Sequence, residues 1–300
     1  MTEKRDSDKR SHAVPGILLM IGAVSTFAML DATAKYTVQA LSTAVVVCFR
    51  YAIASAYVSL LVWRMGGARL LVTSHLRLHA IRGLLLLGAT GFNFLALNYI
   101  QLAQTSAITF SNPLIVCVLS PWLLGERVGL RRWMAVIAGF VGVLIIIRPG
   151  TAGFHWAMAA SVLSALCGAL YQIATRHVGR RDQALTSLFY VTVTGALGAV
   201  PLAAFDWQTP QAWQWGLLGL AAVFGTLGHF MLTEAHRRAP ASLLAPFVYT
   251  QIIPMIVIGF FAFGDIPDAW TLAGALVVIA SGLYVLYRER RAAAGPAGVE

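Results

Sequence analysis

The chain has 300 residues, of which 58% are hydrophobic and 11% are charged. Soluble globular domains of this length do not have such a balance, so the composition indicates a protein whose main solvent is a lipid bilayer. The formal net charge of +10 does not indicate a nucleic-acid partner, because the Lys and Arg residues lie between apolar runs rather than on one basic face.

Ten apolar runs follow one another along the chain, each close to the roughly 20 residues that a helix needs to cross the hydrocarbon region. The fold class predicted from them is an all-α integral membrane protein. We expect transmembrane helices at residues 15–36, 44–63, 83–100, 105–124, 133–147, 153–175, 185–204, 213–234, 242–263 and 269–287.

Basic residues occur almost entirely in alternate gaps between these runs, and Arg148 is the exception. Because cytoplasmic loops carry the basic excess, the pattern predicts a multi-pass protein of the bacterial inner membrane with both termini in the cytoplasm. The basic residues assigned to the cytoplasmic side are Lys4, Arg5, Lys9, Arg10, Arg64, Arg69, Arg77, Arg82, Arg127, Arg131, Arg132, Arg176, Arg180, Arg181, Arg237, Arg238, Arg288, Arg290 and Arg291.

An internal repeat relates residues 105–148 to residues 241–288. Each segment has a Pro-containing span, a turn in which Gly precedes an acid (Gly125-Glu126 and Gly264-Asp265), and a Gly-spaced span that ends at Arg. Five spans in each half would make the second half enter the membrane from the opposite side, giving two inverted repeats. We expect these repeats at 15–148 and 149–288, with cytoplasmic tails at 1–14 and 289–300. The alternative is chance similarity between apolar helices.

Few ionisable side chains fall inside the predicted spans, and such residues are candidates for function because hydrocarbon disfavours charge. Asp31 and Lys35 lie four residues apart, so we expect an ion pair between them. Arg50 enters from the same side, and the three together would favour an anionic group on a solute. The alternative is a structural ion pair that locks the outer ends of the first two helices. Glu234 is a candidate for proton coupling. The alternative is that it is a solvated residue that caps the end of its helix.

Proline interrupts two spans that occupy equivalent places in the two halves, at Pro113 and at Pro246 and Pro254. Interrupted helices release backbone polar groups, which membranes tolerate where the groups line a cavity, so the breaks predict a binding site near the midplane. For each nearby polar residue taken alone, an interhelical hydrogen bond is the alternative. The predicted substrate-binding residues are Asn93, Asn98, Thr109, Asn112, Tyr171, Gln172, His229, Tyr249 and Gln251.

Four short motifs support this picture: Asp31-Ala32-x-Ala34-Lys35, Asn98-Tyr99, Asn112-Pro113 and Leu124-Gly125-Glu126-Arg127. Over residues 15–290 the chain resembles the drug/metabolite transporter superfamily, specifically its EamA-type members. The resemblance implies five plus five helices around a central cavity formed by helices one, three, four, six, eight and nine. The second half departs from the pattern at Gly264-Asp265-Ile266-Pro267, where Gly-Glu-Arg might be expected.

The function predicted is secondary transport of a small organic metabolite, an amino acid or related solute, by alternating access, with export favoured over import. Since the sequence has no Walker-type lysine motif, we expect coupling to an ion gradient such as a proton gradient or exchange with a counter-solute, with simple facilitated flow as the alternative. We also expect no cofactor and no metal. We expect no enzyme activity and a monomer or homodimer in the bilayer. The alternatives are a membrane-embedded enzyme, a flippase for lipid-like substrates, and, within transport, a carrier of a vitamin such as riboflavin or of a metallophore.

Overall fold

The computed structural model describes residues 2–125, 128–178, 183–239 and 241–293. All regular structure in these ranges is helical, and ten segments are long and apolar enough to cross a membrane. The predictions of an all-α integral membrane class and of ten spans are therefore confirmed. Glu126, Arg127, Arg180 and Arg181, which carried part of the motif and charge arguments, lie outside the described residues.

Among the differences from the expected boundaries, two are the largest. The third span begins at Leu76 rather than at residue 83, because Leu76, Leu78 and Ile81 extend its apolar pattern toward the N-terminus. The first helix begins at Thr2, so most of the predicted tail 1–14 is helical. The helices are α1 (Thr2–Val38), α2 (Thr43–Met65), η1 (Gly67–Leu71), α3 (Leu76–Leu97), α4 (Leu102–Thr109), α5 (Asn112–Leu123), α6 (Leu130–Ile147), α7 (Ala157–Val178), α8 (Ala184–Phe205), α9 (Ala212–Arg238), α10 (Ala241–Val248), η2 (Tyr249–Gln251), α11 (Ile252–Phe263) and α12 (Ala269–Ala293).

Both predicted helix breaks are present. The fourth span divides into α4 and α5 at Phe110 and Ser111, directly before Pro113, and the ninth divides into α10 and α11 around the 3₁₀ turn η2. The rings of Phe110 and Tyr249 meet edge to face, with centroids 5.2 Å apart. The two interrupted helices therefore contact each other at their breaks.

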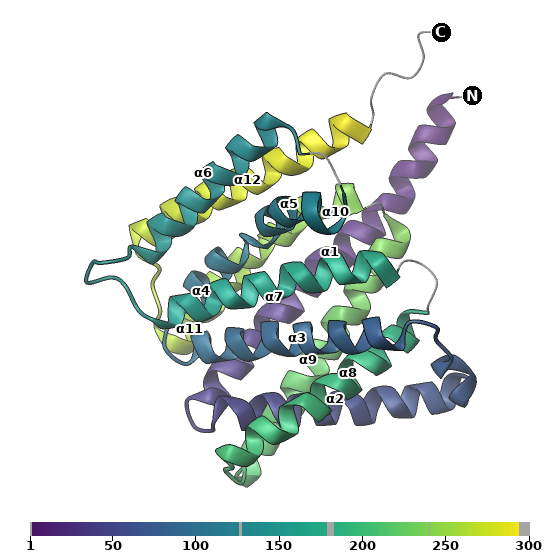
Figure 1. Ribbon diagram of the computed structural model, residues 1–300, viewed down its shortest axis with the longest axis vertical. Coiled ribbons are helices and arrows are strands. Elements are labelled where there is room, and N and C mark those ends of the chain that lie inside the picture. Colours follow the sequence, from purple (N-terminus) through teal and green to yellow (C-terminus); the bar gives the residue numbers. More distant parts are fainter. Residues whose placement is uncertain (1, 126–127, 179–182, 240, 294–300) are drawn as a thin grey trace.

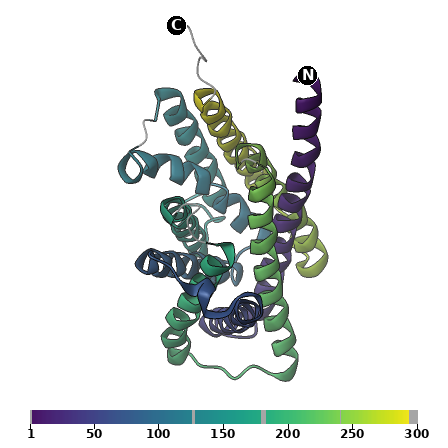
Figure 2. The same cartoon turned by 90° about the vertical axis from the view of Figure 1, so that its right-hand side faces the viewer.

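The most extensive helix pairs are α1 with α9, α3 with α7, α2 with α8, and α6 with α12. Figure 2 shows α1 and α9 side by side, and Figure 1 shows α6 beside α12. Exchanging the first five spans for the last five turns the α1–α9 pair into the α7–α3 pair and leaves the other two pairs unchanged. This is the pattern that two structurally related halves would produce.

The α6–α12 pair is held at backbone contact distance by two glycines. A Cβ atom placed on Gly274 would lie 2.6 Å from the carbonyl oxygen of Gly142, and one on Gly142 would lie 3.0 Å from the carbonyl oxygen of Gly274. Small residues allow membrane helices to approach in this way, which increases their van der Waals contact.

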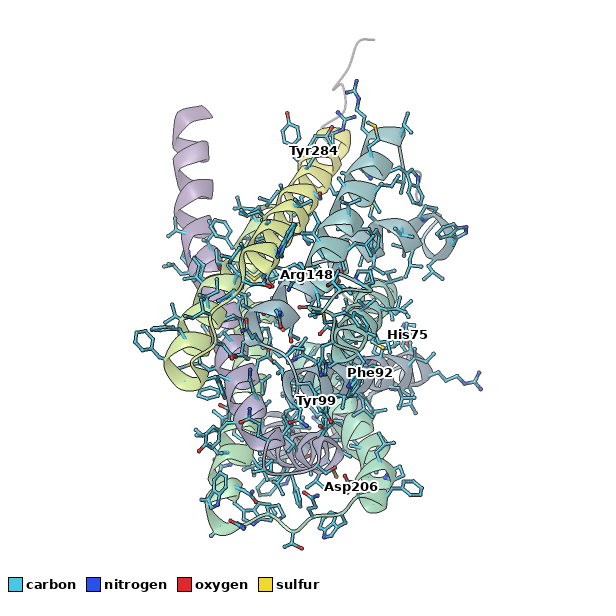
Figure 3. The ribbon with its side chains drawn as sticks, turned by 90° about the vertical axis from the view of Figure 1, so that its left-hand side faces the viewer. His75, Phe92, Tyr99, Arg148, Asp206 and Tyr284 are labelled. Atoms are coloured by element: carbon cyan, nitrogen blue, oxygen red, sulfur yellow. The ribbon has the colours of Figure 1, made fainter. Side chains whose placement is uncertain are left out.

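The two ends of the molecule differ in charge. The N-terminal end of α1, η1 and the C-terminal end of α12 lie toward one side, and the α1–α2 turn and the loop after α6 lie toward the other (Figure 1). The first side, the basic end, carries Arg64, Arg69, Arg131, Arg238 and Arg288, and the second, the acidic end, carries Asp206, Asp265 and Asp268. Figure 3 looks onto the acidic end, with Tyr99 and Arg148 near its centre and Asp206 toward its lower edge.

Candidate functional site

Charged and polar side chains from four helices gather inside the bundle. We call this group the interior polar cluster; its members are Asp31 of α1, Arg50 of α2, Thr90 and Asn93 of α3, and His229 of α9. Asn93 Nδ2 donates to Asp31 Oδ1 at 2.9 Å. Arg50 and Asp31 bind Thr90 and Asn93 on the same face of α3, and a Cβ atom on Gly225, one turn before His229 on α9, would lie 2.9 Å from Arg50 Nη1. Four predicted residues from four helices are thus brought together: Asp31, Arg50, Asn93 and His229.

Arg50 is 5% exposed, and its guanidinium is held mainly by aromatic and hydroxyl groups. Its Nη2 donates to Thr90 Oγ1 at 3.2 Å, and the Tyr51 hydroxyl lies 3.1 Å from the same oxygen. The guanidinium carbon lies 4.0 Å from the centroid of the Tyr51 ring and 5.8 Å from that of Phe94. Stacking of this kind stabilises a weakly hydrated guanidinium but does not neutralise its charge.

The expected ion pair between Asp31 and Lys35 is wrong. Lys35 Nζ instead binds Asp265 Oδ2 at 2.6 Å and the carbonyl oxygen of Ile100 at 3.1 Å. The reason is access: the 264–268 segment brings a carboxylate to the acidic end of α1, whereas Asp31, one turn deeper, is bound by Asn93. The three charged residues predicted to lie together therefore belong to two sites. Asp31 and Arg50 lie inside the bundle, and Lys35 lies at its acidic end.

The Lys35–Asp265 pair connects two segments at the acidic end. It joins α1 to the segment that precedes α12, and Gln101 Nε2 donates to the carbonyl oxygen of Ile266 at 3.3 Å. Both residues of the pair line a pocket of about 370 Å³. The pocket is lined by Lys35, Tyr99, Ile100, Gln101, Gln104, Ala152, Gly153, Phe154, His155, Met158 and Asp265.

A second ion pair at the acidic end joins Arg148, at the end of α6, to Asp268, at the start of α12. Asp268 Oδ1 also accepts the backbone N–H of Thr271 at 2.8 Å, which caps α12. Partial burial alone would raise the pKa of Asp268, but hydrogen bonding from Thr271 and the charge of Arg148 lower it below its ordinary value of 3.8. The carboxylate is therefore stabilised in its charged form.

Another buried guanidinium was missed because Arg82 was assigned to a cytoplasmic loop. Arg82 is 4% exposed within α3 and donates to Thr175 Oγ1 at 3.0 Å and to Ser187 Oγ at 2.5 Å. Its Nη1 also lies 3.2 Å from His79 Nδ1, and its Nη2 donates to the Tyr171 hydroxyl at 3.4 Å. Tyr171, a predicted substrate-binding residue, thus belongs to this second cluster, whose contacts bind α3 to α7 and α8.

Other predicted residues lie at the breaks. Asn112 begins α5 and packs on α7, where a Cβ atom on Gly168 would lie 2.5 Å from its Nδ2, and its Oδ1 is buried without a hydrogen-bond partner. The Tyr249 hydroxyl is likewise buried without a partner and faces Gly282 on α12. Gln251 ends η2, half-buried. Tyr249 forms the contact between the broken helices, and Asn112 and Gln251 lie two residues along the chain from Phe110 and Tyr249, respectively.

The remaining predicted residues have separate surroundings. Thr109 Oγ1 donates to the Ser106 carbonyl oxygen within α4. Asn98 ends α3 near the acidic-end pocket, and Gln172 is exposed on α7. Glu234 forms an ion pair with Arg238 at 3.5 Å, one turn further along α9 at the basic end. A role for any of them in binding or coupling stays a prediction.

The architecture is that of a multi-pass membrane protein with charged groups enclosed between its helices. The EamA-like transporter family matches the chain twice, at residues 14–148 and 155–287. The chain belongs to this family. It is a membrane transporter rather than an enzyme, as its family and its relatives indicate.

The relatives carry different small metabolites according to their names. An S-adenosylmethionine uptake transporter of Rickettsia bellii is 31% identical over 75% of this chain and 78% of its own length. A riboflavin transporter of Vibrio cholerae is 27% identical, covering 94% and 96% of the two chains. A pseudopaline exporter of Pseudomonas aeruginosa is 29% identical over 88% of this chain and 93% of its own.

A solved crystal structure is among those similar to this chain in fold. It has a TM-score of 0.62 at 18% sequence identity and covers 94% of this chain and 98% of that one. At this level of identity the similarity concerns the arrangement of the helices alone.

Proposed function

We propose that this protein is a secondary transporter that moves a small organic metabolite, an amino acid or related solute, across the bacterial inner membrane by alternating access. In this mechanism the halves 15–148 and 149–288 are inverted copies, and the solute binds where they meet. The cycle is driven by a proton or a counter-solute.

The interior polar cluster is the observation that carries the proposal. Burying a charged residue at the centre of a membrane-spanning helix costs about 2.5–3.5 kcal/mol on insertion scales, so such residues are retained where they serve a pathway. Asp31 and Arg50 come from two helices of the first half, and His229 comes from α9 of the second. A solute in contact with these residues would therefore touch both halves.

The Lys35–Asp265 pair would close the pathway on the outer side. Lys35 lies one helical turn beyond Asp31 on α1, and Asp265 belongs to the second half. A solute leaving or entering from the acidic end would have to pass this pair, so its breakage would accompany the outward-open state. Opening of this kind is the step that alternating access requires.

Flux through proteoliposomes tests the transport proposal. Purified protein would be reconstituted and supplied with a panel of labelled amino acids, nucleosides and vitamins, with inward and outward gradients, with and without a pH difference. We expect flux of at least one solute that Asp31→Asn reduces and that Arg64→Gln, at an exposed arginine of the basic end, leaves unchanged. Absence of any flux in either direction, with enzymatic turnover of a panel member, would refute it.

Orientation is part of the same proposal: the basic end, with both termini, faces the cytoplasm. In a chain whose Cys48, Cys117 and Cys167 are replaced by Ala, a membrane-impermeant maleimide added to intact cells should label Asp206→Cys and not Arg64→Cys. The reverse pattern would show the opposite orientation.

A further inference from the structure

Arg50 has more hydrogen-bonding capacity than the protein uses. A guanidinium has five N–H donors, and one hydrogen bond from Arg50, to Thr90, is present. Its Nε is buried without a partner, and within the described part of the chain no carboxylate forms an ion pair with it. A buried charge in this condition is strongly disfavoured unless an anion accompanies it. The side chain is therefore arranged to receive an anion that these helices do not supply.

Asp31, in the same cluster, is a carboxylate without a cationic partner in the part of the chain that the structure describes. Its Oδ1 accepts from Asn93, an uncharged donor, and among the described residues its Oδ2 has no hydrogen-bond partner. Lys35, the basic residue one turn away on α1, is already paired with Asp265. Among the ion pairs of the described residues, none joins Asp31 to Arg50. The carboxylate thus has capacity to accept a hydrogen bond from a cation in addition to its contact with Asn93.

Helix α3 fixes the spacing of these two groups. Thr90 binds Arg50 and Asn93 binds Asp31, and residues three apart lie on one face of a helix with Cβ atoms about 5–6 Å apart. The guanidinium and the carboxylate therefore contact successive turns on the same face of α3. A solute that carries an anionic and a cationic group on one or two adjacent carbons could contact both, with hydrogen bonds of about 2.9 Å to each.

We propose that Asp31 and Arg50 together bind the head group of an amino-acid-like zwitterion, with its carboxylate on Arg50 and its ammonium on Asp31. This inference rests on the proposed transport function and specifies its substrate class. A planar guanidinium binds a carboxylate through two parallel hydrogen bonds, and the free Nε with a neighbouring Nη is a suitable pair of donors.

Solutes with one charge satisfy the site less well. A simple anion would pair with Arg50 and leave Asp31 beside a like charge, whereas a simple amine would pair with Asp31 and leave Arg50 buried without an anion. Unpaired groups of this kind discriminate more strongly than lost apolar contacts. The site therefore selects for both charges on one molecule.

The opposing helix leaves space for the guanidinium. A Cβ atom on Gly225 of α9 would lie 2.9 Å from Arg50 Nη1, so a larger side chain would push Arg50 away. His229, four residues further along α9, packs edge to face on Phe27 with ring centroids 5.1 Å apart. These residues form the second-half side of the site.

Matched ligands test the inference without any substitution. The melting temperature of the purified full-length protein in detergent would be measured with each proteinogenic amino acid. It would then be measured with two matched sets: leucine, 4-methylpentanoate and 3-methylbutylamine; and phenylalanine, 3-phenylpropionate and phenethylamine. We expect at least one amino acid to raise the melting temperature. Its deaminated and decarboxylated analogues should each bind with an affinity lower by a factor on the order of ten or more.

Substitutions assign the two charges. Asp31→Asn should abolish the preference for the amino acid over the deaminated acid, and Arg50→Gln the preference over the amine. Arg64→Gln and Asp206→Asn, which neutralise exposed charges at the two ends, should leave both preferences intact. If a variant fails to fold, the wild-type ligand series still decides the question.

Two outcomes overturn the inference: no proteinogenic amino acid stabilises the protein, or the analogues with one charge bind as well as the amino acid. Flux of other metabolites in proteoliposomes together with either outcome would leave transport intact and refute the head-group site alone. Binding of the amino acid with no flux of it or of any other solute would instead support the site and refute the transport proposal.

Discussion

Asp268 fulfils two roles at one turn of the chain, because it caps α12 and pairs with Arg148 of α6. The ion pair requires its charged form, and the hydrogen bond from Thr271 is stronger to that form. Since its pKa is lowered on folding, its contribution to stability is present above the ordinary value of 3.8 and is lost as the pH falls below that value.

The first prediction follows from this sign. Asp268→Asn should melt at a lower temperature than the wild-type chain at pH 7, and the difference should shrink as the pH is lowered below about 3.8. Thermal unfolding in detergent over a pH series measures it. Asp206→Asn, exposed at the same end, serves as the control. A difference that persists unchanged at low pH would show that the charge of Asp268 does not contribute.

At single positions, the sequence identified which residues matter better than it identified their partners. Asp31 and Arg50 were recognisable because charge is rare in apolar spans. The partner of Lys35 was not, because Asp265 lies 230 residues away and proximity along the helix favoured Asp31. Thr90 was overlooked although it lies one turn from Asn93, because Thr is common as a helix-packing residue.

Among the helices, α6 and α12 show how closely membrane-spanning elements can pack. A Cβ atom on Gly274 would meet backbone atoms of α6, the carbonyl oxygen of Gly142 at 2.6 Å and the nitrogen of Ile146 at 3.2 Å. Backbone atoms cannot move aside as the end of a side chain can, so the helices themselves would have to separate.

The second prediction is that Gly274→Ala destabilises the protein by about 1–3 kcal/mol, the usual effect of overpacking. Gly219→Ala is the matched control, because a Cβ atom there meets nothing within 4 Å and Ala favours the helix. Melting temperatures of the two variants in the same detergent make the comparison. Equal stability of both would show that α6 and α12 do not depend on this contact.

The helix breaks were predictable from the sequence, because proline cannot donate its backbone nitrogen and clashes with the preceding turn. That the two breaks contact each other was not, since Phe110 and Tyr249 meet through tertiary packing of the two halves. The start of α3 was placed too late because Arg82 and His79 interrupt an apolar pattern, and burial of both residues depends on partners in α7 and α8.

For the molecule as a whole, the Lys35–Asp265 pair connects the two halves at the acidic end. The side chains are 7% and 22% exposed, so loss of one partner would leave the other poorly solvated. Removing one member of a buried pair typically costs about 3–5 kcal/mol, which would favour a state in which that end is open.

The third prediction uses the variant in which Cys48, Cys117 and Cys167 are replaced by Ala. A reporter cysteine, Asn93→Cys, is placed in it deeper in the bundle than the Lys35–Asp265 pair. Adding Lys35→Gln should increase its labelling by an impermeant maleimide from outside on the order of tenfold. Gln104→Cys, which lines the same pocket as that pair, should label at an unchanged rate. The charge exchange Lys35→Asp with Asp265→Lys should restore slow labelling.

Identical labelling of Asn93→Cys with and without Lys35→Gln would place the closure elsewhere. Faster labelling of both reporters together would indicate general loosening of the structure. Only a change confined to the inner reporter supports this pair as the outer closure.

Lys35 and Asp31 occupy successive turns of a single helix, so a tilt of α1 carries both residues with it. A solute that prefers Asp31 in one position of α1 consequently shifts the equilibrium between the paired and separated forms of Lys35 and Asp265. Thermodynamic linkage makes this reciprocal: any factor by which the intact pair tightens equilibrium binding is the factor by which the bound solute favours the pair. In the proposed cycle, solute binding at Asp31 and the state of the Lys35–Asp265 pair would therefore both depend on the position of α1.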